Sequence, residues 1–227
     1  MEKALHTDSL YVPAPQEIVE TDLLSLIPKE MRDEFGAGEC RLVAADVNRC
    51  LYPRLVYRVY PEFVVAAGGV RIGRSTLGVG PKNVSVLRRC VQVAVCIGTV
   101  GAEVTALHKR YDAEGHPLRA YLCDGAANVA LDRLMLRWRT ECLPGHATYP
   151  ICPGCCQWDI AEQQLLFSLV EARSVGVSLS ASGLMRPIKS ISAVVGISPT
   201  ECFATAECDV CGRKNCIYRE FRNVALK

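Results

Sequence analysis

Four cysteines close to the C-terminus constrain the last part of this chain more than any other feature. Cys202, Cys208, Cys211 and Cys216 follow a C-x5-C-x2-C-x4-C spacing within fifteen residues. Polar residues and a glycine separate them, which is typical of a loop that can bend its side chains toward one point. Thiolate sulfur is a preferred ligand of Zn²⁺ and of iron–sulfur clusters. The spacing therefore predicts one metal centre held by these four side chains. Four unconnected thiols are the alternative.

The total number of cysteines bears on the cellular compartment. The chain has 13 cysteines, an odd number, in 227 residues. No basic stretch followed by an apolar stretch lies between Met1 and Ser9, so we expect no secretory signal. Without export, thiols stay reduced. We therefore predict a cytoplasmic protein, in a cytoplasm that is poor in oxygen.

Composition and charge exclude two classes of partner. Half of the residues are apolar, which is enough for a sizeable core. No uninterrupted apolar run approaches the roughly 18–20 residues that a membrane span needs. The net charge is +2 and there is no basic run. We therefore expect neither a membrane nor a nucleic acid as a partner.

The hydrophobic pattern predicts a mixture of helices and strands. Helical spacing favours helices at 16–35 (broken at Pro28), 84–89, 101–111, 118–138 and 163–172. Runs rich in Val, Leu, Ile and Tyr favour strands at 40–47, 51–65, 91–97, 174–179 and 188–197. The two types do not alternate strictly, so the α+β class is favoured over a doubly wound sheet. We expect an N-terminal arm with helices (1–38), one α+β domain (39–200) and a cysteine-cluster segment (201–227).

The segment 141–158, ECLPGHATYPICPGCCQW, has the composition of a ligand-binding loop. It is too long for a simple connection between two helices. Cys152, Cys155 and Cys156 could form a second thiolate site, a redox pair, further ligands of the C-terminal site, or small buried side chains. His146 could be a ligand, a proton carrier or a loop residue without a chemical role.

Four segments together resemble the activation domain of cobalamin-dependent methionine synthase, in its short stand-alone form. They are VQVAVCIGTVGAEV (91–104), LCDGAAN (122–128), PGHATYP (144–150) and SVGVSLSASGLMRPIKSISAVVGIS (174–198). The likeness to the stand-alone members continues through the cysteine cluster and covers about residues 84–220. No single motif is decisive, but their order matches that of the family.

The resemblance implies a fold and a ligand site. It implies a twisted, mainly antiparallel sheet with helices packed on it. It also implies that S-adenosylmethionine binds the loop 141–158, which would line one cleft with the turn before Lys189. At the family's Arg position this chain has Glu141, with Arg139 the nearest substitute, and His146 replaces the family's aromatic residue. The cofactor-binding residues expected on this basis are Arg139, Glu141, Pro144, Gly145, His146, Tyr149 and Lys189.

The resemblance also implies a function, the reductive reactivation of a corrinoid protein such as methionine synthase. The partner carries the cobalamin, and reactivation needs one electron and a methyl group from S-adenosylmethionine. An iron–sulfur cluster, [4Fe–4S] in type, on the four C-terminal cysteines would supply the electron, and zinc is the alternative metal. Two other functions stay open: a zinc-stapled interaction module without catalysis, and an iron–sulfur electron carrier for another partner. The sequence leaves open whether the chain is itself an enzyme.

Overall fold

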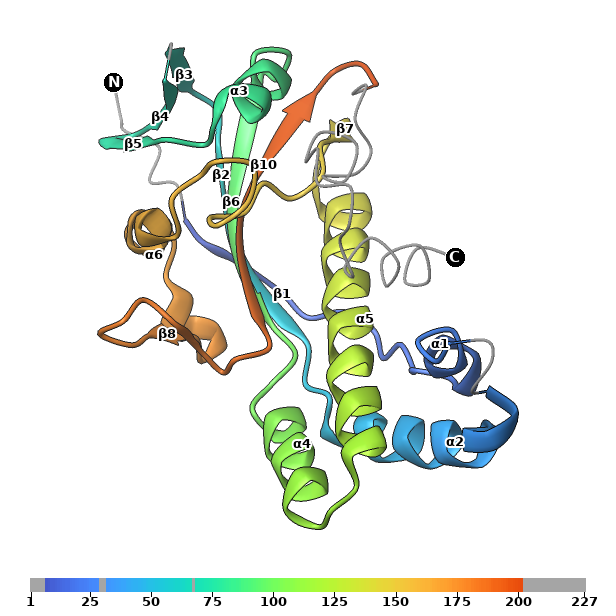
Figure 1. The fold of residues 1–227 in the computed structure, drawn as a ribbon. Coiled ribbons are helices and arrows are strands. Elements are labelled where there is room, and N and C mark those ends of the chain that lie inside the picture. The colour runs from blue at the N-terminus through green and yellow to red at the C-terminus, as the bar shows by residue number, and fades with distance from the viewer. Residues whose placement is uncertain (1–6, 29–31, 67, 202–227) are drawn as a thin grey trace.

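A five-stranded antiparallel sheet forms the centre of the molecule (Figure 1). The structure, a computed structural model, describes residues 7–28, 32–66 and 68–201. The strand order is β1-β2-β6-β10-β7. The bounds are β1 (Ser9–Tyr11), β2 (Arg54–Tyr60), β6 (Gln92–Thr99), β7 (His146–Ala147) and β10 (Ser190–Ser198). In this register Thr99 lies opposite both Arg54 and Ser190, so three strands meet at one end of the sheet.

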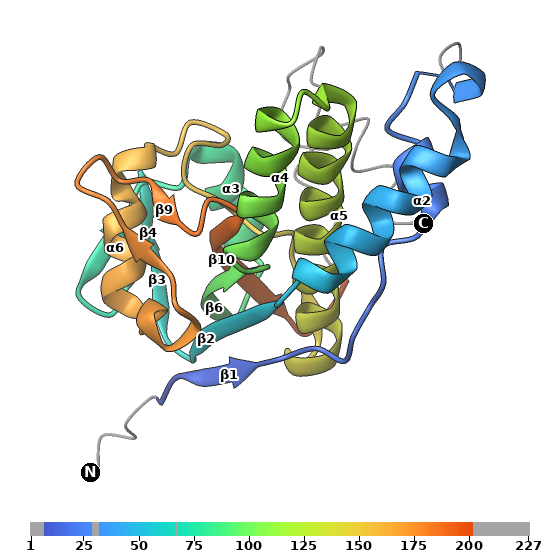
Figure 2. The same ribbon diagram turned by 90° about the horizontal axis from the view of Figure 1, so that it is seen from below.

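Helices cover one face of the sheet. The long helix α5 (Pro117–Cys142) packs directly on it. Three further helices pack against α5 and make a second core with it (Figure 2). They are α1 (Glu20–Leu24), α2 (Arg32–Cys50), which is kinked at Gly36, and α4 (Glu103–Ala113).

Shorter elements cover the opposite face of the sheet (Figure 2). The helices there are α3 (Pro81–Leu87), α6 (Gln163–Leu169) and the 3-10 turns η2 (Ile160–Glu162) and η3 (Ala172–Val175). A three-stranded sheet consists of β3 (Phe63–Ala66), β4 (Gly69–Ile72) and β5 (Ser75–Leu77). A two-stranded sheet consists of β8 (Ser178–Leu179) and β9 (Met185–Arg186).

Strand β6 shows why the central sheet has no polar face. Val93, Val95 and Ile97 belong to the core on the α3 and α6 side, whereas Ala94 and Cys96 belong to the core under α5. Successive side chains of a strand point to opposite faces, so coverage on both sides requires an unbroken apolar run. The prediction of a buried strand at 91–97 is confirmed, and so is the α+β class with a mainly antiparallel sheet.

Two strand predictions are wrong. Residues 40–47 lie inside α2. The buried residues there are Cys40, Val43, Ala44 and Val47, at the i, i+3, i+4, i+7 spacing of a helix face. Residues 174–179 do not form one strand either, because η3 occupies their start and only Ser178 and Leu179 pair with β9.

Among the described residues, no helix combines the length and the apolar character needed to cross a bilayer. The longest helix, α5, carries charged residues along its length and contacts the sheet and three other helices.

Candidate functional site

Lys189 lies where three of the family-like segments meet, between α5 and the start of β10. Its Nζ is 2.6 Å from Asp124 Oδ1 and 2.9 Å from Asn128 Oδ1. Its backbone oxygen accepts hydrogen bonds from the Thr99 hydroxyl and the Val100 N–H, both at 3.1 Å. The group formed by Thr99, Asp124, Asn128 and Lys189 is called the Lys189 cluster below. It joins residues that are far apart in the sequence.

The local sequence explains how each part of the Lys189 cluster is placed. Asp124 and Asn128 are four residues apart on α5, so they share one face of the helix. Thr99 ends β6, and its hydroxyl accepts the Gly101 N–H at 3.1 Å. Gly101 has φ +101°, a conformation that favours glycine. The Thr-Val-Gly sequence therefore makes the turn from β6 toward α4.

The Lys189 cluster presents a carboxylate to solvent. The Asp124 side chain is 47% exposed, whereas that of Lys189 is 17% exposed. Asp124 could therefore accept a hydrogen bond from an ammonium or hydroxyl group of a ligand while Lys189 holds it in place. Asp124 and Asn128 lie in a segment that the sequence singled out, but they were not predicted as site residues. Their i, i+4 spacing around small residues was the available signal.

Most predicted residues of the loop 141–158 make contacts inside the fold. Tyr149 is fully buried, and its hydroxyl donates to Asn83 Oδ1 at 2.7 Å. Gly145 has φ +71°, and a Cβ there would lie 2.7 Å from the Ser198 carbonyl oxygen. Pro144 and His146 are exposed, and His146 pairs with Ser198 at the edge of the sheet.

Arg139 and Glu141 point to different neighbours. Arg139 Nη1 donates to the Thr148 carbonyl oxygen at 2.6 Å, which fixes the loop to α5. Glu141 accepts from the Tyr11 hydroxyl at 2.7 Å and from Arg137 Nε at 2.8 Å. These two hydrogen bonds lower the pKa of Glu141, while burial and the Glu141 carboxylate raise the pKa of Tyr11. Arg139 therefore links α5 to the loop, and Glu141 links α5 to β1.

The structure separates Lys189 from the rest of the predicted site residues. His146 pairs with Ser198 at the end of β10, whereas Lys189 precedes the first residue of that strand. Nine residues of extended chain span about 30 Å. The loop also reaches the middle of β10, where Ile151 forms a bridge with Val194. The loop and the turn before Lys189 thus lie toward opposite ends of the strand (Figure 1).

The cysteine-rich part of the loop forms a tight turn against the Gly78–Gly80 segment. The Cys155 N–H donates to the Cys152 carbonyl oxygen at 3.2 Å, across Pro153 and Gly154. A Cβ on Gly80, whose φ is +82°, would lie 2.2 Å from the Cys156 carbonyl oxygen. Within the part of the chain that the structure describes, no group of three or more Cys, His, Asp or Glu side chains is arranged to hold a metal ion.

Other cysteines of the described chain behave as core side chains. Burial raises the pKa of Cys123 to about 12, and it also raises the pKa of Cys96, Cys40 and Cys50. A thiol with a raised pKa stays protonated at neutral pH and is a poor nucleophile or metal ligand. The predicted metal ligands Cys202, Cys208, Cys211 and Cys216 lie outside the described residues.

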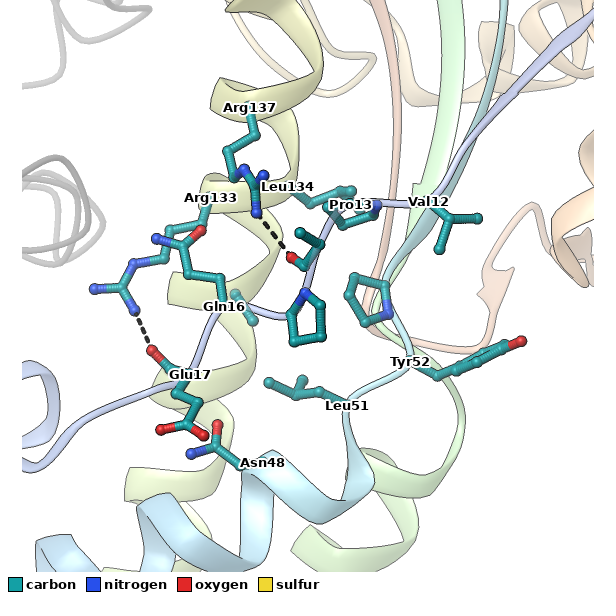
Figure 3. Close-up of a pocket in the computed structure, with 14 residues that line it drawn as sticks. Val12, Pro13, Gln16, Glu17, Asn48, Leu51, Tyr52, Arg133, Leu134 and Arg137 are labelled. Atoms are coloured by element: carbon teal, nitrogen blue, oxygen red, sulfur yellow. Dashed lines mark hydrogen bonds between the residues drawn. The ribbon is translucent and has the colours of Figure 1, made fainter. Parts of the chain in front are cut away.

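A pocket of about 310 Å³ lies between α5, the end of α2 and the N-terminal segment 12–17 (Figure 3). Arg133 Nη1 donates to the Glu17 carbonyl oxygen at 3.2 Å, and Arg137 Nη1 donates to that of Ala14 at 2.8 Å. These bonds hold the N-terminal segment over the pocket. Both arginines also have carboxylate partners, Asp22 and Glu141. Since both positive charges are neutralised, the mostly apolar pocket has little means of selecting a charged ligand.

Comparison with solved structures found chains of similar fold. No family model matches the chain, and no curated protein matches it. Among solved structures, the chain is similar to the crystal structure of the MetH reactivation domain bound to AdoHcy. The identity is 16% and the TM-score is 0.48, and the match covers 95% of this chain and 88% of that chain. A likeness at this identity and score does not establish a family.

Proposed function

We propose that this protein reactivates a corrinoid protein, such as methionine synthase, by delivering an electron to its oxidised cobalamin. The observation that carries the proposal is the Lys189 cluster. It brings together Thr99, Asp124 and Lys189 from three segments whose order along the chain resembles the activation-domain family. Contact between such distant motif residues is expected if the motifs serve one site.

The donor set at the C-terminus fits a redox role. Cys202, Cys208, Cys211 and Cys216 offer four thiolates, which suit a [4Fe–4S] cluster and also suit zinc. An iron–sulfur cluster held by them would supply one electron at a low potential. Iron is favoured because the reactivation of cobalamin requires an electron, which zinc cannot supply.

The proposed contact surface includes the cysteine segment 202–216. The described chain ends at Glu201, three residues after β10, and Ser198 at the end of β10 pairs with His146 of the loop. Cys202 is the next residue. We propose that the corrinoid partner contacts this segment, because electron transfer requires the cluster to lie close to the cobalt.

The test is the anaerobic reduction of cob(II)alamin on a purified corrinoid partner, followed by its absorbance. The full chain should accelerate the reduction by a reductant that is slow alone, and Cys208→Ser or Cys211→Ser should abolish this. Cys50→Ser is the matched control, because Cys50 is half-buried at the end of α2 and lies outside the four-cysteine segment. Equal rates for all variants would leave the zinc-stapled interaction module as the function.

Metal analysis after anaerobic purification separates the two readings of the cysteine cluster. A brown protein that contains iron and sulfide supports the electron-delivery role. A colourless protein with one bound zinc supports an interaction module without catalysis. An iron protein that does not reduce a corrinoid partner is an electron carrier for another partner.

S-Adenosylmethionine binding is a second proposed property of the same protein. The exposed carboxylate of Asp124 favours it, because a carboxylate held by Lys189 can accept the ammonium group of the methionine part. Of the residues that the sequence assigned to this ligand, Lys189 holds Asp124. The others, Arg139, Glu141, Pro144, Gly145, His146 and Tyr149, belong to the loop 141–158 or contact it. Calorimetry should detect binding, and Asp124→Asn should weaken it whereas Asp112→Asn on α4 should not. Absence of heat at millimolar ligand would remove the methyl-donor role alone.

A further inference from the structure

We propose that the groove between α4 and the chain segments around Gly176 and Arg186 binds the phosphate group of a small anionic ligand. The groove has a volume of about 490 Å³. It lies at the end of α4 that follows β6, and it shares no residue with the Lys189 cluster. The inference is independent of the corrinoid partner.

Small residues keep the groove open. Ala102, Ala106 and Lys109 line it from α4, at the i, i+4, i+7 spacing of one helix face. Gly176 and Ser178 line the opposite wall. None of the four short side chains reaches across, so a ligand can approach the backbone on both sides.

Two cations line the groove without an acidic partner among the described residues. Lys109 and Arg186 both line it, and both side chains are exposed. Neither side chain makes an ion pair or hydrogen bond with any part of the chain that the structure describes. Elsewhere in the fold the arginines that line pockets are paired, as Arg133 is with Asp22. The two unpaired charges give the groove a positive potential.

A third cation, Arg54, lies directly behind Gly176 in the wall of the groove. A Cβ on Gly176 would come within 3.0 Å of Arg54 Nη2, so the guanidinium touches this glycine. Arg54 is half-buried and stacks on the Tyr52 ring, with 4.6 Å between its Cζ and the ring centroid. Its Nε is buried and has no hydrogen-bond partner among the described residues. A partly buried cation without a counter-ion is unfavourable, and an anion in the groove would offset this.

The surrounding groups do not cancel this charge. Glu103 begins α4, but its carboxylate lies beside Gly101 and Tyr52. A Cβ on Gly101 would come within 3.0 Å of Glu103 Oε2. Asp112 is one turn beyond Lys109, and its Oδ2 lies 3.3 Å from His108 Nε2. It makes no ion pair with Lys109 among the described residues. The N-terminus of α4 adds a partial positive charge, because Ala102 as its N-cap has no side chain that could cap it.

The side chains at the groove indicate phosphate rather than a larger polyanion. Arginine and lysine together suit a compact, multiply charged oxyanion. Pro187 and Ile188 also line the groove, and Ile188 is 61% exposed. They offer an apolar surface next to the cations. Inorganic diphosphate and a nucleoside diphosphate both carry the phosphate groups that the cations would bind. The nucleoside diphosphate could also place its base on Ile188.

The test is calorimetric titration of the full chain at low salt, with inorganic pyrophosphate and with ADP as probes. Both should bind saturably. Lys109→Ala and Arg186→Ala should each weaken binding by about tenfold or more, because each removes one charge-assisted contact. Arg74→Ala is the matched control, since Arg74 is an exposed arginine in the turn between β4 and β5. Unchanged melting temperatures will show that the variants are folded.

The outcomes distinguish the two sources of phosphate. Equal affinity for pyrophosphate and ADP supports a site for phosphate alone, and tighter binding of ADP supports a nucleotide site that uses Ile188. The proposal is overturned if neither probe binds saturably at millimolar concentration. It is also overturned if Arg74→Ala weakens binding as much as Lys109→Ala and Arg186→Ala, because the effect is then one of net charge.

Discussion

Replacing Asp22 by alanine should strongly destabilise the helical side of the molecule. Arg133 Nη1 and Nη2 donate to the two Asp22 oxygens at 2.9 and 2.7 Å. The side chains are only 15% and 10% exposed. Removing one partner of such a pair leaves the other charge desolvated, which costs about 3 kcal/mol. We take this lower end of the range because Arg133 keeps its bond to the Glu17 carbonyl oxygen.

The magnitude converts into a change of melting temperature. For a chain of this size, 1 kcal/mol corresponds to about 2–4 °C, so Asp22→Ala should lower Tm by about 6–12 °C. Differential scanning calorimetry under reducing, anaerobic conditions measures the change. Replacing both partners by apolar residues, Asp22→Leu with Arg133→Met, should recover most of the loss, because no unpaired charge then stays behind.

Glu20→Ala is the control for this prediction. Glu20 lies in the same short helix and pairs with Arg41 at 3.0 Å, but the Arg41 side chain is 73% exposed. An exposed pair contributes less than about 1 kcal/mol. If Asp22→Ala lowers Tm no more than Glu20→Ala does, the burial of the Asp22–Arg133 pair does not stabilise the fold as argued here.

Three further predictions concern single side chains. Hydrogen bonds from Arg119 lower the pKa of Glu39 below its ordinary value of 4.5. The stability that the ionised Glu39 contributes is therefore present above pH 4.5, and it is lost as the pH falls through the lowered pKa. The stability difference between wild type and Glu39→Gln, below about 1 kcal/mol for this partly exposed pair, should therefore disappear in acid urea melts. Gly80→Ala should lower Tm, because its Cβ would overlap the Cys156 carbonyl oxygen. Gly38→Ala should raise the free energy of unfolding by about 0.5–1 kcal/mol, because Gly38 lies inside α2 with open space around it.

The elements that the sequence predicted well are those with local signals. The run 91–97 is apolar without interruption, and the structure covers both faces of that strand. Helix α5 was also predicted, because its apolar positions recur at helical spacing over several turns. The strand assigned to 40–47 was wrong because Val and Leu favour strands weakly, whereas the i, i+3, i+4, i+7 spacing of its buried residues favoured a helix.

The arrangement of the candidate site depends on contacts between distant residues. Nothing near Lys189 in the sequence indicates that its ammonium group meets Asp124, 65 positions earlier. The same holds for Tyr149, whose hydroxyl bonds to Asn83 and therefore faces the core rather than a ligand. A motif gives the residue type and the order along the chain. The direction of each side chain follows from strand register and helix packing, which no single segment encodes.

We propose that an iron–sulfur cluster on the C-terminal cysteines delivers an electron to a corrinoid. The most direct measurement is the electron paramagnetic resonance signal of cob(II)alamin on a purified partner, recorded anaerobically after addition of the reduced protein in the absence of other reductant. The account predicts that the signal disappears with the wild-type chain and with Cys50→Ser, and persists with Cys211→Ser. Persistence of the signal with reduced, iron-loaded wild-type protein would contradict it.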